Sequence, residues 1–516
     1  MTTHMNRATK VGIDDMSFYI PGIYLPIEDL AEARDLEYAK LNKGLGLNAM
    51  SVADAGEDAA TMAANAVLDL IRKNELDPRR IGRIYLGTES ALDGSKPMAS
   101  YLVDMLSDYF AADYGEDCFL HCDVVDLTFA CIGAVDALQN TLDWARGRND
   151  RIGIVVGADN AKYELGSGGE YTQGAGAVAV LVKSNPRLLA FRDAWGVATR
   201  PVHDFFKPLR SVTKQELVEE VLRLAGQDAQ QAAKLLAKIP DNTEVNGVLD
   251  SNEDTFLLHK ETPVFDGPYS NDCYQQRIGE ALDNFKIKAG IDAGEAVTDR
   301  WHRLAFHLPY AYQARRMFSE VFVEEAQRRG DWPLIQEELG QELPARTDFD
   351  NEKEYQKAYG RFLRAITKTP AYRNFVNVRI EKGERASSLV GNLYTSSIFL
   401  ALMSSLEADF SEGCELRGLR MGFFAYGSGS KSKVFEAEVQ PQWREVVSRF
   451  GLMQTLDNRQ PLDYAVYEDL HRGRRQQPAG PVEGRFLLEK VETQRPNYIG
   501  ARSYRRMEHA PAVAEK

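Results

Sequence analysis

Short apolar runs alternate with segments of helical spacing along residues 11–205. The runs are brief, rich in β-branched residues and bounded by polar or glycine-containing turns, so they predict buried strands. These strands are expected within residues 10–21, 80–90, 122–129, 151–159 and 174–184. Residues 57–74 predict an amphipathic helix with acidic residues near its start and basic residues near its end, as the helix dipole favours. Apolar strands separated by helices indicate a mainly parallel sheet with both faces covered.

The pattern changes in the middle of the chain and then returns. Residues 209–257 are charged, helical in spacing and rich in Ala and Gln, which predicts an inserted surface hairpin outside the sheet. Further on, residues 302–322 predict a strand followed by a helix, and residues 418–439 predict two strands joined by a Gly/Ser turn. Residues 330–385 predict a second charged, helical excursion at the surface.

The end of the chain predicts one more strand at residues 485–491, followed by a basic polar tail that should fray. The chain is therefore expected to divide into four segments. They are an N-terminal half, a helical insertion, a C-terminal half and a final strand with its tail, at residues 1–205, 206–257, 258–475 and 476–516.

Composition narrows the class of protein. The 516 residues are 44% apolar and 27% charged, as in an ordinary globular enzyme. A formal net charge of −14 argues against nucleic-acid binding, which needs clusters of Lys and Arg. No window approaches the ~20 consecutive apolar residues of a membrane span, and the first residues lack the apolar core of a secretory signal. Five sparse cysteines, without metal-site spacing, indicate unpaired thiols in a reducing, cytoplasmic compartment and no metal centre.

Cys131 is the first candidate for chemistry. It follows the predicted strand at residues 122–129 and precedes apolar residues at helical spacing, Val135, Leu138 and Leu142. A thiol at a helix N-terminus faces unpaired N–H groups and the positive end of the helix dipole, and both favour the nucleophilic thiolate. A buried structural cysteine fits the position equally well.

Two further residues have the right chemistry at informative positions. Glu89 ends the strand IYLGTE, where a carboxylate often faces a ligand crevice, although a solvated loop acid is the simpler explanation. His307 lies in AFHLPYAY after an apolar strand, where a hydrogen-bonded core imidazole is the alternative. Together a thiol nucleophile, a carboxylate base and a histidine that polarises a carbonyl suit acyl transfer followed by attack of a carbon nucleophile. The glycines of GGEYTQGAGAVAV suit close backbone approach and not a phosphate loop, and GSGS suits either close backbone approach or a hairpin turn.

Eight blocks in order resemble the 3-hydroxy-3-methylglutaryl-CoA synthase family of the thiolase superfamily. They are KGLGLNAM, GTESALDGSKP, FACIGAVDAL, GADNAKY with GGEYTQGAGAVAV, PVFDGPYSNDCY, FHLPY, GNLYTSS and YGSGS. The resemblance covers most of the chain and implies a five-layer αβαβα fold made of two similar halves. It assigns catalysis to Glu89, Cys131 and His307. It implies substrate contacts by Asp159, Tyr163, Thr172, Pro309, Tyr310, Asn392 and Ser397.

The resemblance also implies the reaction. Cys131 would take the acetyl group from acetyl-CoA, and Glu89 would remove a proton from its methyl group. The carbanion would attack the ketone of acetoacetyl-CoA, whose oxygen accepts hydrogen bonds from His307 and Asn392. Water would then release HMG-CoA for the mevalonate pathway. No metal or bound cofactor is expected, and a homodimer is expected by analogy with the superfamily.

Three departures keep an alternative open. Tyr312 stands where the family usually has a lysine that holds CoA phosphates, although Arg315 and Arg316 follow. Ile132 replaces a frequent Tyr, and the insertion at 209–257 is unusual; it is expected to cover either the pantetheine entrance or an oligomer surface. A polyketide β-branching enzyme that takes acetyl from an acyl carrier protein therefore remains the alternative. A non-catalytic relative or a decarboxylating condensing enzyme is disfavoured because Cys131, Glu89 and His307 are all present.

Overall fold

The computed structural model describes residues 10–238, 254–292 and 294–508. The chain separates into a large unit, Met1–Asp204 with Gly267–Lys516, and a small unit, Phe205–Asp266. No helix among the described residues is long and apolar enough to cross a bilayer.

The first half of the large unit builds one side of a mixed sheet in the order β5-β4-β6-β7-β1. The strands are β1 Val11–Tyr19, β4 Ile81–Gly87, β5 Asp123–Leu127, β6 Ile152–Ala161 and β7 Gly174–Ser184. β4 runs parallel to β5 and β6, whereas β7 is antiparallel to both β6 and β1. The expectation of a mainly parallel sheet is therefore wrong, because β1 and β7 pair antiparallel with all their neighbours in this sheet. Residues 162–173 connect β6 to β7 with a 3-10 turn at Glu170–Thr172 and no α-helix, and without a crossover helix the chain returns antiparallel.

The sheet continues in the order β13-β14-β15-β8, in which β8 comes from the N-terminal half of the chain and the other three strands come from the C-terminal half. These strands are β8 Leu189–Thr199, β13 Arg303–Phe306, β14 Arg420–Gly427 and β15 Lys431–Val439. Within the described part of this sheet, the two groups of strands pair with each other only at Gly12 with Ala190 and Ile13 with Leu189, between β1 and β8. The sheet is thus two sheets that meet at a narrow seam.

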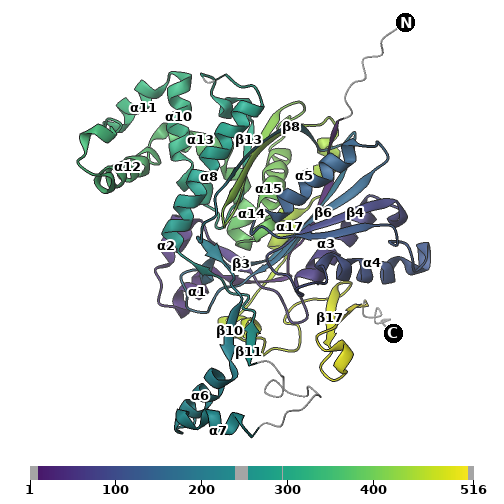
Figure 1. Cartoon of the computed structure of the whole chain (residues 1–516). Helices are drawn as coiled ribbons and strands as arrows, with labels where there is room; N and C mark the ends of the chain where they lie inside the picture. The colour runs from purple at the N-terminus through teal and green to yellow at the C-terminus, as the bar shows by residue number, and fades with distance from the viewer. Residues whose placement is uncertain (1–9, 239–253, 293, 509–516) are drawn as a thin grey trace, which may run out of the picture. The chain divides into compact units, whose positions relative to one another are not determined.

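Helices cover both halves and lie between them, so that five layers alternate (Figure 1). The main helices are α3 Ala59–Lys73, α4 Met98–Tyr114, α5 Gly133–Arg146, α8 Gly267–Lys288, α14 Glu381–Val390 and α15 Ser397–Ser411. α5, α14 and α15 share the central apolar core with both sheets, α3 and α4 pack on the outer face of the first, and α8 packs on the outer face of the second. The αβαβα architecture predicted from the sequence is confirmed.

Strands buried on both faces explain the continuous apolar runs of the sequence. In β7, Val178 and Val180 belong to the central core, whereas Ala177 and Ala179 belong to the outer core beside α3. Successive side chains point to opposite faces of a strand, so a strand between two cores needs apolar residues at every position.

Shorter elements complete the large unit. They are β2 Ile23–Pro26, β3 Ala49–Ser51, β16 Gln460–Pro461, α1 Ile27–Ala33, α2 Tyr38–Leu45, α9 Gln313–Met317, α10 Ser319–Arg329, α11 Trp332–Leu339, α12 Glu352–Ile366, α13 Pro370–Arg379, α16 Trp443–Val447, α17 Leu452–Asp457 and α18 Tyr464–His471. The second excursion predicted from the sequence is helical, as α11 to α14 show.

The small unit contains the insertion. Strands β10 Arg210–Thr213 and β11 Thr255–Leu258 pair antiparallel, and β9 Phe205–Phe206 pairs with β12 Val264–Phe265. Helices α6 Lys214–Leu224 and α7 Ala232–Leu236 follow β10. Residues 239–253 of the predicted insertion lie outside the described residues. The domain boundaries drawn from the sequence remain predictions.

Three details differ from expectation. β5 is not buried: it ends the sheet, with Asp123 and Val125 exposed. The tail does not fray before residue 507, because β18 Arg502–Arg506 pairs with β17 Phe486–Val491. α3 is almost wholly buried instead of amphipathic, since Phe486 belongs to the same core.

Gly87 at the end of β4 lets this strand touch the first turn of α5. A Cβ there would lie 2.1 Å from the backbone nitrogen of Ala134. We expect Gly87→Ala to lower the free energy of unfolding by about 1–3 kcal/mol, the usual cost of overpacking, as measured by urea denaturation. Gly44→Ala is the matched control, because Gly44 lies in α2 with nothing within 4 Å of its added Cβ. Equal destabilisation by both would contradict this close approach.

Candidate active site

Cys131 and Glu89 meet between β4 and α5. The thiol of Cys131 donates a hydrogen bond to Oε1 of Glu89 over 2.8 Å. Glu89 lies two residues beyond β4, and Cys131 lies two residues before α5, so the tight packing of these elements at Gly87 brings the two side chains together. Cys131 is 8% exposed, which leaves a route to the sulfur while excluding most water.

The turn that carries Cys131 is shaped by its neighbours. Ala130 adopts a left-handed conformation with φ of +40°, which is costly for a residue with a side chain. Gly427, at the end of β14, packs against this turn, and a Cβ there would lie 2.7 Å from the carbonyl oxygen of Phe129 and 2.9 Å from the nitrogen of Ile132. The YGSGS block of the second half therefore supports the nucleophile of the first by close backbone approach, as its glycines suggest.

Asp159 holds the Glu89 segment in place. Its side chain is fully buried, and Oδ1 accepts hydrogen bonds from the Glu89 N–H over 2.7 Å and the Thr88 hydroxyl over 3.0 Å. Oδ2 accepts from the N–H and hydroxyl of Thr395, over 3.0 and 2.6 Å. Both oxygens thus accept hydrogen bonds from the protein, and Asp159 holds the end of β4 against the loop before α15; its contact with a substrate stays a prediction.

Tyr163, Thr172 and Asn392 surround the same pair. Tyr163 is hydrogen-bonded to Thr172 and Tyr394, and burial, with the nearby charge of Cys131, raises the pKa of Tyr163. The Asn392 N–H donates to the Thr172 carbonyl over 3.0 Å, and its side-chain oxygen accepts from the Tyr394 N–H over 2.8 Å. This bond orients the Asn392 amide so that its NH₂ group faces away from the backbone.

Tyr394 and Thr395 are site residues that sequence reasoning missed. Burial, followed by the influence of Tyr163, Glu89 and Cys131, raises the pKa of Tyr394, which places its phenol beside the reacting pair. Both residues lie in the GNLYTSS block, from which only Asn392 and Ser397 were predicted to act. The whole block belongs to the site, because it forms the loop between α14 and α15 that reaches into the first half.

His307 follows β13 and is buried as a neutral imidazole. It is 2% exposed, and burial lowers its pKa to about 3. Its backbone is fixed on both sides, since its N–H donates to Phe424 over 3.0 Å and its carbonyl accepts from the Tyr274 hydroxyl over 2.9 Å. Nδ1 has no hydrogen-bond partner among the described residues. The ring is thus held firmly while one nitrogen keeps unused hydrogen-bonding capacity.

The segment from Asn392 to Ser397 links His307 to the Cys131 pair. The Ser397 hydroxyl accepts from the Leu308 N–H over 2.7 Å and donates to the Leu308 carbonyl over 3.1 Å, directly after His307. Two residues earlier, Thr395 binds Asp159. Ser397 is 2% exposed, and its two hydrogen bonds hold the backbone beside His307.

Pro309 and Tyr310 lie just beyond His307 and are half-buried. Burial raises the pKa of Tyr310, and the guanidinium of Arg316 lies 5.6 Å from the centre of its ring. Tyr312 packs against Gly46, where a Cβ would approach its ring to 2.5 Å. The guanidinium of Arg315 lies 3.8 Å from the Tyr312 ring and is paired with Glu384, whereas Arg316 is exposed.

A hydrogen-bond network behind Tyr163 is the second feature that the sequence did not reveal. The Tyr163 N–H donates to Oε1 of Gln173 over 2.7 Å, and its carbonyl lies 2.8 Å from Nε2 of His471. The hydroxyl of Tyr467 accepts from Gln173 over 2.8 Å and donates to Glu170 over 3.0 Å. Helix α18, near the end of the chain, therefore braces the loop that carries Tyr163.

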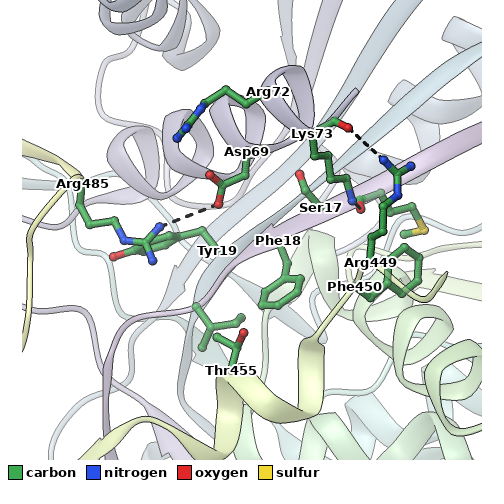
Figure 2. A pocket seen from close by; sticks show the side chains of 12 residues that line it. Ser17, Phe18, Tyr19, Asp69, Arg72, Lys73, Arg449, Phe450, Thr455 and Arg485 are labelled. Atoms are coloured by element: carbon green, nitrogen blue, oxygen red, sulfur yellow. Dashed lines mark hydrogen bonds and ion pairs between the residues drawn. The ribbon is translucent and has the colours of Figure 1, made fainter. Parts of the chain in front are cut away.

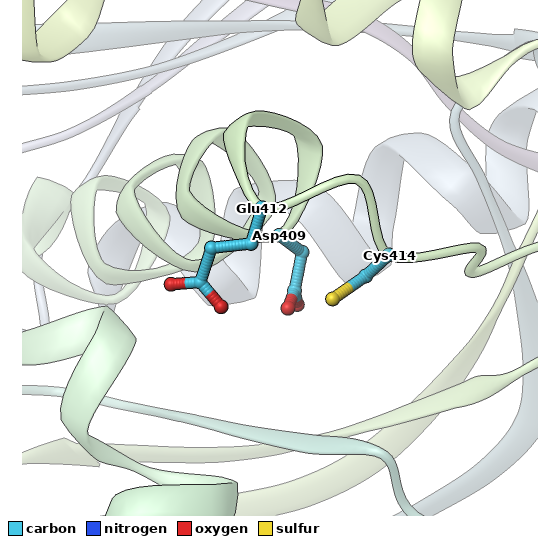
Figure 3. Close-up of side chains that lie close together, drawn as sticks. All are labelled: Asp409, Glu412 and Cys414. Carbon is cyan, nitrogen blue, oxygen red and sulfur yellow. The ribbon is translucent and has the colours of Figure 1, made fainter.

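One group of side chains in the described part of the chain has the spacing of a metal site. Asp409, Glu412 and Cys414 lie at the far end of α15 from Ser397 (Figure 3). Asp409 is already paired with Arg303 over 2.6 Å and Lys382 over 2.7 Å. Burial opposes ionisation there, but these two cations outweigh it and lower the pKa of Asp409. The group is an ion-pair network whose cations disfavour a metal ion.

The buried His307 makes stability depend on pH. Its pKa is about 3 in the folded protein and about 6.5 when exposed, so between these values only the unfolded chain binds the proton. Stability should then fall as pH is lowered from 7.5 to 5.5, with about 1.4 kcal/mol of the loss due to this residue. Urea denaturation at both pH values should show a smaller loss for His307→Gln than for the wild type. Identical pH slopes would show that His307 is not buried in the neutral form.

Models of hydroxymethylglutaryl-coenzyme A synthases match both halves of the chain. The N-terminal model of the family matches residues 7–186, and the C-terminal model matches residues 256–477. The hydroxymethylglutaryl-CoA synthase of Haloferax volcanii is 28% identical over 466 residues, which cover 90% of this chain and 91% of the relative. That of Enterococcus faecalis is 28% identical over 459 residues, which cover 89% and 90%.

Solved structures agree with these matches. MvaS in complex with 3-hydroxy-3-methylglutaryl coenzyme A is 25% identical, with a TM-score of 0.70 over 97% of this chain and 100% of that one. The Curacin Biosynthetic Pathway HMG Synthase in complex with Acetyl Donor-ACP shares the fold, with a TM-score of 0.67 and 18% identity over 96% and 100% of the two chains. The chain therefore belongs to the hydroxymethylglutaryl-CoA synthase family, as a condensing acyltransferase with a thiolase-like fold.

Proposed function

We propose that the chain condenses acetyl-CoA with acetoacetyl-CoA and hydrolyses the enzyme thioester to give HMG-CoA and CoA. The observation that carries the proposal is the 2.8 Å contact between the Cys131 sulfur and the Glu89 carboxylate. An acyl nucleophile and a base in direct contact suit a reaction in which the base acts on the acyl group that the nucleophile holds.

In the first step, Cys131 attacks the acetyl thioester and releases CoA as a thiol. The sulfur lies just before the N-terminal end of α5, whose backbone N–H groups and dipole favour its anionic form. The acetyl methyl group is then attached through one carbon to a sulfur that touches Glu89. Glu89 is therefore within reach of the methyl proton, and its removal gives the carbanion.

In the second step, the carbanion attacks the ketone carbon of acetoacetyl-CoA. We assign the stabilisation of the ketone oxygen to N–H donors of His307 and Asn392, because the oxygen gains negative charge as the bond forms. With a pKa of about 3, His307 acts as a neutral hydrogen-bond donor and not as an acid. Glu89 returns its proton to the oxygen, and water then hydrolyses the Cys131 thioester. These steps require no metal and no redox cofactor.

We infer that the CoA phosphates are bound by a residue other than the lysine that the family usually has. Tyr312 is packed on Gly46, and Arg315 is paired with Glu384. Arg316, seven residues beyond Pro309, is exposed beside Tyr310, so we assign the phosphate contact to Arg316. The loss of the lysine favours one second candidate, condensation with a donor held on an acyl carrier protein, as in polyketide β-branching.

Two donors distinguish the candidates. The enzyme is mixed with acetyl-CoA or with acetyl loaded on a carrier protein, and intact mass reports acetylation of Cys131. Acetyl-CoA should acetylate the wild type, and acetoacetyl-CoA should then be consumed. Acetylation by the carrier alone would support the second candidate, and acetylation by neither would refute both.

Glu89→Gln separates the two steps. The variant should still acquire an acetyl group, because the helix end activates the sulfur, but condensation should slow by at least about 100-fold without the base. Cys131→Ser is the control that should not be acetylated by either donor. Loss of acetylation in Glu89→Gln would instead place Glu89 in the first step.

We further propose that the enzyme is a cytoplasmic homodimer. None of the five cysteines forms a disulfide in the described residues, which suits a reducing compartment. The exposed Val125 on edge strand β5, which pairs only with β4 in the described residues, offers a place for a second copy. Light scattering should give twice the chain mass of 57.8 kDa. Val125→Arg should halve it, whereas Leu334→Arg, at an equally apolar exposed position on α11, should not.

A further inference from the structure

A cavity with several cationic side chains opens where β1 parts from β8. β1 pairs with β8 only at Gly12 and Ile13, and beyond them residues 16–20 line a cavity of about 480 Å³ (Figure 2). The other walls come from α3, from the turn between α16 and α17, from α17 and from the residue before β17. None of the lining residues belongs to the Cys131 site.

At one end of the cavity two cations share one carboxylate. Nζ of Lys73 lies 2.9 Å from Asp15, and a guanidinium nitrogen of Arg449 lies 2.8 Å from the other oxygen of Asp15. Arg449 also donates to the Lys73 carbonyl over 2.9 Å (Figure 2). Burial, only partly opposed by Asp15, lowers the pKa of Lys73. These groups hold each other in place and keep one positive charge in excess.

At the other end a second pair of cations lies near the carboxylate of Asp69. Arg485 lies 3.9 Å from Asp69 and 5.0 Å from the centre of the Tyr19 ring. Arg72 is exposed and has no ion-pair or hydrogen-bond partner among the described residues. Burial raises the pKa of Asp69, and the nearby Arg485 and Arg72 partly oppose this shift. Among the residues that line the cavity, this end has two cations and one carboxylate, in a chain whose net charge is −14.

Aromatic side chains lie between the two charged ends. Phe18 and Phe450 line the cavity, and Nζ of Lys73 lies 5.4 Å from the centre of the Phe450 ring. A ligand that fits these walls combines oxygen anions with an apolar or planar part. Arginine forks bind phosphate oxygens in pairs, and the end with Arg72 and Arg485 offers two guanidinium groups to one phosphate.

We propose that this cavity binds a phosphate-bearing organic anion. The phosphate is held by Arg72 and Arg485, and the apolar part lies against Phe18 and Phe450. The site is separate from the one that holds the thioester substrates, so it does not depend on the function proposed above.

Phenyl phosphate is the probe, because it is the simplest molecule with both parts. Calorimetric titration in the presence of saturating CoA should show one bound phenyl phosphate per chain, held more tightly than inorganic phosphate. Arg72→Gln should weaken binding about tenfold, since a charge-assisted hydrogen bond is lost without disturbing any partner within the protein. Arg485→Gln should weaken it as well.

Arg361→Gln is the matched control, because Arg361 is likewise an exposed helical arginine, on α12, and should bind phenyl phosphate like the wild type. Urea denaturation of each variant shows that folding is intact. Absence of binding to the wild type, equal binding by Arg72→Gln and the wild type, or equal loss in Arg361→Gln would each overturn the proposal. Loss of binding whenever CoA is present would place the phosphate in the CoA site and overturn it too.

Discussion

The carboxylate of Asp159 is the constraint on which the rest of the site depends. A buried charge is costly unless donors surround it, and here they come from the end of β4 and from the loop between α14 and α15. The donors belong to different halves of the molecule, so the charge is stabilised only when the halves are packed together. The packing of the two halves therefore also fixes the position of Glu89.

The titratable side chains of the site differ in protonation state because their surroundings differ. Glu89 touches the sulfur and is partly exposed, whereas His307 is enclosed and stays neutral. Two neighbouring tyrosines are kept in the phenol form by burial. One group is therefore left to move protons, while the others offer fixed hydrogen bonds whose strength increases because water is excluded.

Much of the architecture follows from the sequence, because strands with two buried faces leave an unbroken apolar run, as in β7. The structural features that the sequence did not predict depend on contacts between residues far apart in the chain. The order of the residues does not reveal that β5 ends the sheet, or that Phe486 buries α3. The site shows the same division. Glu89, Cys131 and His307 could be predicted, because the motifs that carry them occur in order along the chain. The anchoring by Asp159 and the bracing by Tyr467 are contacts across 236 and 297 positions of sequence.

The seam between β1 and β8 has a wider consequence. Two residue pairs are all that join the strands there, and Gly12 approaches so closely that a Cβ would lie 1.8 Å from the Leu189 carbonyl oxygen. Each half keeps an outer core of its own, while the shared central core holds the halves together. Low concentrations of denaturant should therefore loosen the contact between the halves first and abolish activity while most of the helices and strands persist.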